Sequence, residues 1–125
     1  MLYKARPLKI YLYQRPVDFR KQINGLAAIV EAEFGGSALG SRLDLWERSW
    51  FVFIARDKKK VKILYFRHAG LCLWQYRLDE DLFCMGRPRG DKTIGVSWRV
   101  LKRFLDGHNI FLDSPHARQK IKRYS

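Results

Sequence analysis

Acidic residues are scarce in this 125-residue chain. It holds 12 Asp and Glu residues against 25 Lys and Arg residues, so its formal net charge is +13 at pH 7. Such an excess of one sign opposes compaction and attracts polyanions over about 8 Å, the screening length at physiological salt. The shortage of carboxylates therefore indicates nucleic acid as the polyanion that this protein meets.

Long apolar runs and paired cysteines are also lacking. The hydrophobic stretches extend for only a handful of residues before a charge interrupts them, well short of the roughly 20 residues that a membrane-spanning helix needs. The N-terminal residues 1–7 show neither the apolar core nor the cleavage site of a secretory signal. We therefore expect a cytoplasmic protein with no membrane partner, in which Cys72 and Cys84 are free thiols.

The residue constellations that catalysis or metal binding requires are missing too. A two-metal phosphoryl-transfer site needs three convergent carboxylates, and no spacing in this chain singles out such a triad. The carboxylates in plausible places are Asp18, Asp44, Asp57 and Glu80. The two cysteines and His68 are scattered, without a Cys-x-x-Cys pair, and no phosphate loop or nucleotide-binding fingerprint occurs. We expect a protein that is not an enzyme and has no metal or other cofactor.

The chain does contain enough apolar and aromatic material for one core. Its hydrophobic content of 47% and its length suit a single domain over residues 1–125 and leave little room for a second. The ends of the chain, residues 1–7 and 112–125, are basic, and we expect them to be mobile.

Strand-forming residues gather in three segments. Residues 9–14 are rich in aromatic and branched side chains, and so are residues 50–54 and 61–66. The polar and basic residues 55–60 separate the last two segments, which predicts an antiparallel hairpin. Neither hairpin segment alternates cleanly between apolar and polar residues, so we expect helices to cover both faces of their sheet.

Helical spacing of apolar residues occurs in two segments. In the first, from Asn24 to Phe34, Asn24 is placed to cap the first turn. Whether this helix starts earlier, within residues 18–23, stays open. In the second, Ser97 precedes a helix over residues 98–106. Residues 35–49 between helix and hairpin resemble a loop.

Residues 71–78 fit both the strand period and the helical period, and we favour a helix or helical turn there. Together these segments predict an α+β fold. Its expected architecture is a small, mostly antiparallel sheet with a central hairpin, packed by two or three helices.

Two groups of cations flank predicted turns and are candidates for phosphate contact. The hairpin loop and the strand after it supply Arg56, Lys58, Lys59, Lys60 and Lys62. The Pro16 turn supplies Arg15, Arg20 and Lys21. Cations at the tip of a rigid element can contact successive phosphates and displace counterions. A solvated turn in the first case, and an ion pair with Asp18 or ordinary helix-start charges in the second, are the alternatives.

A third basic group lies near the C-terminal helix. Its members are Arg87, Arg89, Lys92, Arg99, Lys102 and Arg103. Helical spacing brings the last three close together, so this face can track DNA or can be the wet side of an amphipathic helix. The aromatic residues Trp50, Trp74, Tyr76 and Trp98 can stack on unpaired bases, but core packing is the stronger expectation for them.

Three ordered blocks of residues carry a family resemblance. The first runs over residues 16–21 (PVDFRK) and 24–30 (NGLAAIV). The second comprises residues 51–53, 61–65, 70–71, 73–74 and 76–78, and the third is residues 104–107 (FLDG). In order and spacing these blocks resemble the TnpB accessory proteins of insertion-sequence-sixty-six-type elements, over roughly residues 8 to 110. The resemblance implies a role in DNA transposition beside a separate transposase of the same element, with no catalytic activity of its own.

Two functions are consistent with these features. The first is a non-catalytic accessory protein of transposition that binds DNA, at the ends of the element, through its basic surfaces and assists the transposase. The second is a protein-interaction subunit that docks on the transposase without contacting DNA. The oligomeric state, the DNA sequence recognised and the step of transposition affected stay open.

Overall fold

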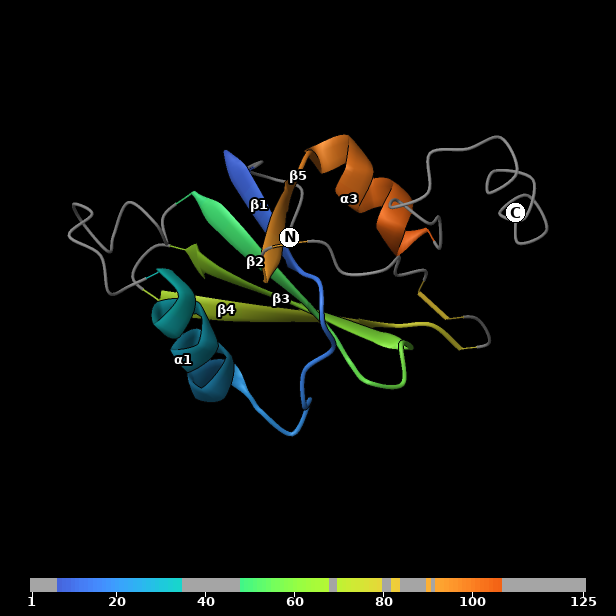
Figure 1. Ribbon diagram of the computed structural model, residues 1–125, viewed down its shortest axis with the longest axis horizontal. Helices are drawn as coiled ribbons and strands as arrows, with labels where there is room; N and C mark the ends of the chain where they lie inside the picture. Colours follow the sequence, from blue (N-terminus) through green and yellow to red (C-terminus); the bar gives the residue numbers. More distant parts are fainter. Residues whose placement is uncertain are drawn as a thin grey trace.

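A single mixed sheet organises the described part of the chain. The computed structural model describes residues 7–34, 48–67, 70–79, 82–83, 90 and 92–106. Its elements are β1 (Lys9–Tyr13), α1 (Ile23–Phe34), β2 (Ser49–Ile54), β3 (Lys60–Arg67), β4 (Gly70–Arg77), β5 (Thr93–Val96) and α3 (Trp98–Leu105). The five strands lie between α1 and α3, which cover opposite faces (Figure 1).

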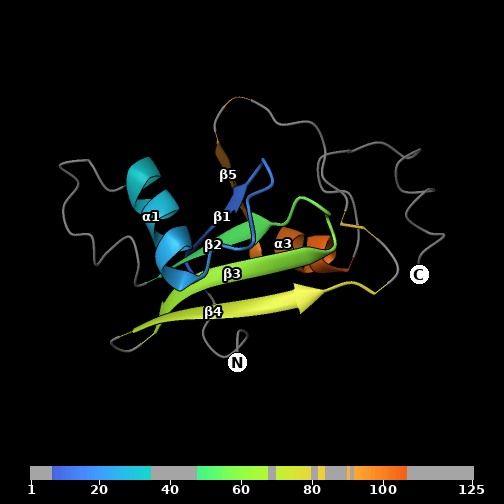
Figure 2. The same ribbon diagram turned by 90° about the horizontal axis from the view of Figure 1, so that it is seen from below.

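The strand order is β4-β3-β2-β1-β5, with β4 and β5 at the two edges (Figure 2). All neighbouring strands pair antiparallel except β1 and β2, which are parallel with Leu12 opposite Val52. A parallel pair needs a crossover connection, and α1 lies in the connection from β1 to β2. The predicted α+β class with a mostly antiparallel sheet is therefore confirmed, and the segments predicted to pair, 50–54 and 61–66, do so as β2 and β3.

Each face of the sheet carries its own apolar cluster. On the α3 face, Leu101 and Phe104 pack with side chains from β1, β2 and β3 and with Phe83. On the α1 face, Leu26 and Val30 pack with Phe51, Phe53 and Leu64. All six residues of β2 are buried, because this strand lies in the middle of the sheet with a helix over each face. That position explains why its sequence does not alternate.

The first helix begins at Ile23, within the range 18–23 that the sequence leaves open. The Leu26 N–H donates to the Gln22 carbonyl over 2.9 Å, so Gln22 occupies the capping position and Asn24 lies inside the first turn. The predicted Asn24 cap is therefore wrong. Ile23 packs against the α1-face cluster. This packing favours a helix that includes Ile23, and it outweighs the preference of Asn24 for the capping position.

The second helix follows its sequence signals closely. The Ser97 hydroxyl accepts a hydrogen bond from the Val100 N–H over 3.1 Å, which confirms the predicted cap. Leu101 and Phe104 on the inner side of α3 are buried. Neither helix in the described ranges has the length and apolar character that crossing a bilayer requires.

The preference for a helix over residues 71–78 is wrong, because Gly70–Arg77 forms strand β4. Every residue of β4 has a partner on β3, for example Trp74 opposite Ile63. Pairing with the preceding strand decides between the helical period and the strand period, which residues 71–78 fit equally well. Most of the predicted loop 35–49 lies outside the described residues. So do the predicted mobile ends, 1–7 and 112–125, except Pro7.

Candidate functional site

Hydrogen bonds within the loop between β2 and β3 hold it in one conformation. The Ala55 N–H donates to the Lys60 carbonyl over 3.0 Å, and the Lys58 N–H donates to the Ala55 carbonyl over 2.9 Å. The Asp57 carboxylate accepts the Lys59 N–H over 2.9 Å, a local bond typical of Asp in turns. The cations of this loop therefore extend from an ordered backbone.

Residues that follow β4 also hold this loop in place, through backbone hydrogen bonds. The Leu78 N–H donates to the Lys59 carbonyl over 2.8 Å, and the Phe83 N–H donates to the Lys58 carbonyl over 2.7 Å. The Phe83 side chain is 1% exposed and belongs to the α3-face cluster. The loop backbone is thus anchored to the core, while the side chains of Lys58 and Lys59 remain exposed.

Lys58 has an unusual backbone conformation for a residue with a side chain. Its φ is 59°, and no other non-glycine residue in the described part of the chain has a positive φ. The left-handed region costs an L-residue about 1–2 kcal/mol relative to ordinary conformations. Glycine would occupy this position with much less strain, yet the chain has a lysine whose charge lies at the loop tip.

The segment between β1 and α1 lies directly beside this loop. The Val17 N–H donates to the Ile54 carbonyl over 2.9 Å, and Val17 pairs with Ala55 in an isolated parallel bridge. Residues 14–22 therefore run beside the end of β2 in space, where the hairpin loop begins. This contact brings together the cations of the Pro16 turn and those of the hairpin loop, which are separate groups in the sequence.

Asp18 lies within the joined basic region and is strongly stabilised as a carboxylate. Its Oδ2 atom is 2.7 Å from Nη2 of Arg20. Hydrogen bonds from the side chain and backbone of Arg20 hold the pKa of Asp18 well below its usual range, and the charge of Arg56 adds to this. The alternative of an ion pair for Arg20 is thus observed, so the Asp18 charge offsets that of Arg20.

Lys62 does not lie on the surface, so its predicted role in phosphate contact is wrong. Its residue is 2% exposed, and its Nζ donates to the carbonyls of Phe19 and Lys21 over 3.1 and 3.2 Å. The ammonium also lies 4.8 Å from the ring centroid of Phe19. Burial, with the nearby charge of Lys60, lowers the pKa of Lys62. Lys62 fastens the segment before α1 onto the sheet.

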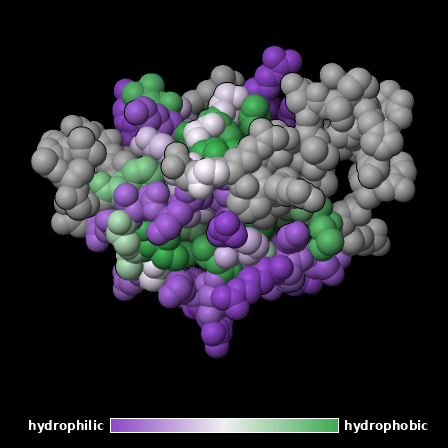
Figure 3. Space-filling model, in the orientation of Figure 1, coloured by the Kyte–Doolittle hydropathy of each residue, from purple (hydrophilic) through white to green (hydrophobic). Residues whose placement is uncertain are grey.

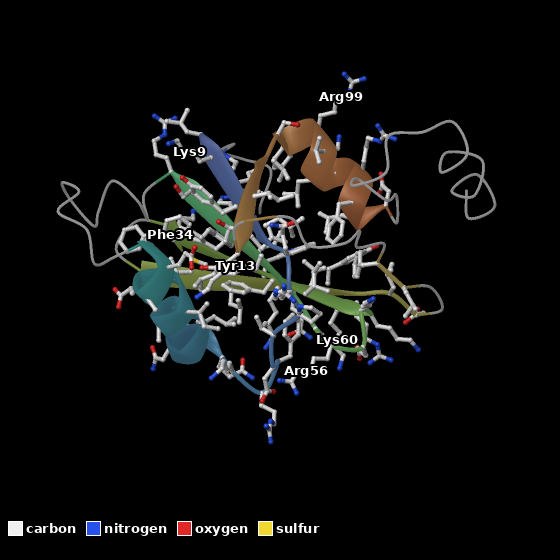
Figure 4. The ribbon with its side chains drawn as sticks, in the orientation of Figure 1. Lys9, Tyr13, Phe34, Arg56, Lys60 and Arg99 are labelled. Atoms are coloured by element: carbon white, nitrogen blue, oxygen red, sulfur yellow. The ribbon has the colours of Figure 1, made fainter. Side chains whose placement is uncertain are left out.

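We call the resulting cationic region the loop-end surface. Its members are Arg15, Arg20, Lys21, Arg56, Lys58, Lys59, Lys60 and Arg77. Arg77 is not among the predicted site residues, because its strand, β4, is not predicted from the sequence; the strand register places Arg77 opposite Lys60. Hydrophilic side chains gather along the lower edge of the molecule in Figure 3, where the sticks of Figure 4 place Arg56 and Lys60.

Most charges of the loop-end surface are not neutralised within the described ranges. Lys60 is 3.8 Å from Asp57, and Arg20 pairs with Asp18 as described above. In the part of the chain that the structure describes, no carboxylate forms an ion pair with Lys21, Lys58 or Lys59, nor with Arg77. This surface therefore has the surplus positive charge that attracts a polyanion.

The third predicted basic group is only partly described. Arg99, Lys102 and Arg103 are exposed on α3, and Figure 4 shows Arg99 on the opposite side of the molecule from Arg56 and Lys60. Lys92 lies 3.8 Å from Glu33. Arg87 and Arg89 lie outside the described residues. The α3 cations thus form a surface separate from the loop-end surface.

Within the described ranges, no three Asp, Glu, His or Cys side chains come close enough to share a metal ion. Cys72 is a free, half-buried thiol. Asp44, His68, Glu80 and Cys84 lie outside the described residues.

Comparison with protein families gives a match over most of the chain. The family model described as IS66 Orf2 like protein matches residues 8–114, which is most of the chain and spans every described helix and strand. Neither a curated protein nor a solved structure matches the sequence or the fold.

Proposed function

We propose that this chain, which belongs to the family of IS66 Orf2-like proteins and is therefore a transposition-associated accessory protein, binds DNA through its loop-end surface and assists a separate transposase. In this proposal it is not an enzyme, and its contribution is to hold the DNA of the element, at its ends, for the transposase. The phosphate backbone supplies the contacts, so the binding is electrostatic and depends on salt.

One observation carries the proposal, namely the convergence of two basic segments on one exposed region. The Val17–Ala55 bridge places residues 14–22 next to the hairpin loop. The burial of Lys62 under this segment keeps the two together. Phosphates of a duplex are regularly spaced, so fixed cations on neighbouring loops can contact several of them at once.

The conformation of Lys58 gives independent support. Strained backbone positions persist where the surrounding structure holds them, and they concentrate at functional sites. Here two hydrogen bonds anchor Lys58, one from its own N–H to Ala55 and one from Phe83 to its carbonyl. A lysine kept at a position that suits glycine is consistent with a function for its ammonium group.

A salt titration of duplex binding tests the proposal. The full chain is mixed with a labelled duplex that carries an end of the element, and the affinity is measured at several salt concentrations. We expect the affinity to fall steeply as salt rises. In the double variant Lys58→Ala/Lys59→Ala, the slope of log affinity against log salt should decrease by about 0.9 for each lost phosphate contact.

A matched control removes two cations from the other end of the sheet. Lys9 and Arg48 are exposed, and they lie where β1 and β2 begin. The variant Lys9→Ala/Arg48→Ala changes the net charge by the same amount and should leave most of the slope in place. Absence of duplex binding at low salt, or equal slopes for the two double variants, contradicts the proposal.

A second function, docking on the transposase without DNA contact, is favoured by apolar side chains at the surface. Leu8 is 70% exposed and Leu82 is 51% exposed. A protein partner that covered these side chains would remove their apolar surface from water, which is the main driving force of protein association. Co-purification of the two proteins after nuclease treatment, together with no duplex binding by this chain alone, would favour this second function.

A further inference from the structure

The strand β4 presents aromatic side chains on the α3 face of the sheet. Strand alternation places Trp74 and Tyr76 on this face, opposite Ile63 and Val61 of β3. The two rings are stacked, with centroids 5.6 Å apart and an interplanar angle of 11°. Tyr76 is 39% exposed, and Trp74 is half-buried. In the described ranges no strand pairs with the outer edge of β4 (Figure 2).

Other aromatic residues of this face are used by the core. Trp50 is 6% exposed and contacts Tyr65 and Trp98. The expectation of core packing therefore holds for Trp50, and Trp74 and Trp98, which are partly buried, also pack against the same cluster. It does not account for Tyr76, whose ring reaches the surface at the edge of the sheet.

Tyr76 is the outer end of a chain of rings that begins inside the protein. Phe104 of α3 stacks on Phe83 with centroids 5.2 Å apart, and Phe83 lies 6.1 Å from Tyr76. Phe83 and Phe104 are buried. Because this chain of rings and Trp74 support the Tyr76 ring on two sides, little side-chain freedom is lost when a flat ligand stacks on it.

Cations lie at both ends of the β3–β4 pair, but strand alternation places only Arg67 on the face of the aromatic strip, with Lys60 and Arg77 on the α1 face. Arg67 lies opposite Gly70 at one end of the β3–β4 pair, and Lys60 lies opposite Arg77 at the other end. The ends are separated by seven residues, about 23 Å along a strand. Arg67 and Arg77 are exposed, and neither has a carboxylate partner within the described ranges.

We infer that the aromatic strip formed by Trp74 and Tyr76 is a stacking site for the unpaired bases of single-stranded DNA, with Arg67, which strand alternation places on the same face, contacting the phosphates at one end. This inference rests on the proposed DNA binding and names an unpaired strand as a preferred substrate. Every base has a flat face, so aromatic stacking combined with backbone cations binds single strands without sequence preference. In a duplex the bases are already stacked on each other and do not reach the strip.

The test compares two DNA ligands of equal length at one salt concentration, a single-stranded oligothymidylate and a duplex. We expect the wild-type chain to bind the single strand more tightly. Tyr76→Leu should weaken single-strand binding by roughly five- to 150-fold, the range for loss of one stacked base. The same variant should leave duplex binding nearly unchanged. The matched variant Tyr76→Phe keeps the ring and should keep the affinity for both ligands.

A cross-linking measurement on the unaltered chain gives a second readout that does not depend on a variant. Oligothymidylate containing 5-iodouracil is irradiated in the complex, and the modified peptide is identified after trypsin digestion. The inference predicts the modification in peptide 68–77, which trypsin releases between Arg67 and Arg77. Modification confined to other peptides would overturn it.

The remaining outcomes separate this inference from the proposed function. Duplex binding that depends on Lys58 and Lys59, with no preference for the single strand and no effect of Tyr76→Leu, overturns the stacking site alone. Failure to bind either DNA at low salt overturns the proposed function and this inference with it. Binding of a ribonucleotide strand at least tenfold tighter than its DNA counterpart would overturn the assignment to DNA.

Discussion

At the scale of the residue, Tyr13 shows how burial couples the fold to pH. Its side chain stacks on Phe53 with centroids 4.6 Å apart. Its hydroxyl is buried and has no hydrogen-bond partner among the described residues. Burial raises the pKa of Tyr13 above its ordinary value, and the charge of Glu33 raises it further. The neutral phenol is therefore the form that the fold accepts.

The substitution Tyr13→Phe tests this assignment. At pH 8 we expect the free energy of unfolding to be equal or higher by up to about 1 kcal/mol, because an unpaired buried hydroxyl is removed. The unfolded chain loses the Tyr13 proton near pH 10, whereas the folded chain keeps it. The free energy of unfolding of the wild-type protein is therefore at its full value below about pH 10 and falls as the pH rises above that value, and Tyr13→Phe lacks this fall. Denaturant unfolding of both proteins at pH 8 and pH 11 should show a gap that widens at pH 11. A constant gap would contradict the raised pKa.

Lys62 shows that the charge of a residue does not by itself place it on the surface. A neighbouring run of lysines marks it as a surface cation, but strand alternation turns it toward the α1 face. There it meets the carbonyls of Phe19 and Lys21, which are distant in sequence. Local sequence contains no signal for this contact, because only the pairing of β2 with β3 and the path of residues 14–22 create it.

The substitution Lys62→Met separates structure from DNA contact. Methionine keeps the packing of the stem but leaves two carbonyls without their donor, so we expect a loss of about 1–3 kcal/mol in the free energy of unfolding. The salt slope of duplex binding should change by less than about 0.9, the decrease that one lost phosphate contact gives, because the Val17–Ala55 bridge still holds residues 14–22 beside the loop. Lys59→Met is the matched control, since this exposed residue should change stability by less than about 0.5 kcal/mol and reduce the slope. A slope lowered by about 0.9 or more for Lys62→Met in the folded protein would contradict the structural role.

At the scale of the element, the hairpin loop combines two opposing requirements. Its hydrogen bonds to Ala55 and Phe83 hold Lys58 in the left-handed region, which raises the energy of that residue. In exchange the loop has a fixed shape and an exposed cation at its tip. Stability and DNA binding therefore respond in opposite directions to a change at this position.

The substitution Lys58→Gly is expected to show this opposition. Glycine accepts a positive φ without steric cost, so the free energy of unfolding should rise by about 0.5–1 kcal/mol after its own entropy cost. Duplex affinity should fall because one phosphate contact is lost. Lys58→Asn, which tolerates the same conformation, should show the same loss of affinity with a smaller gain in stability. A fall in stability for the glycine variant would show that Lys58 is not strained.

Elements differ in how well their sequence predicts them. Ser97 and the apolar spacing of Trp98, Leu101 and Leu105 specify α3 locally, so helix and cap are both predicted, although the structure buries Phe104 together with Leu101. Residues 71–78 fit two periods, and only the partner strand β3 makes them a strand. The start of α1 falls between these cases, because packing of Ile23 overrides the capping preference of Asn24.

At the scale of the whole molecule, the charge and the family could be predicted from sequence, whereas the site could not. The net charge of +13 and the ordered blocks need no coordinates. The convergence of the Pro16 turn with the hairpin loop depends on the parallel pairing of β1 with β2. That pairing requires α1 as a crossover, and it decides which cations share a surface and which, like Arg99, lie elsewhere (Figure 4).

The most direct test of the account is to map the duplex-binding surface by amide chemical shifts in the full chain. We predict that titration with duplex DNA perturbs the amides of residues 56–60 and 19–21 first, because the loop-end surface carries the contact. The amides of Arg99, Lys102 and Arg103 should move less. Perturbations confined to α3, with the hairpin loop unchanged, would contradict the central claim.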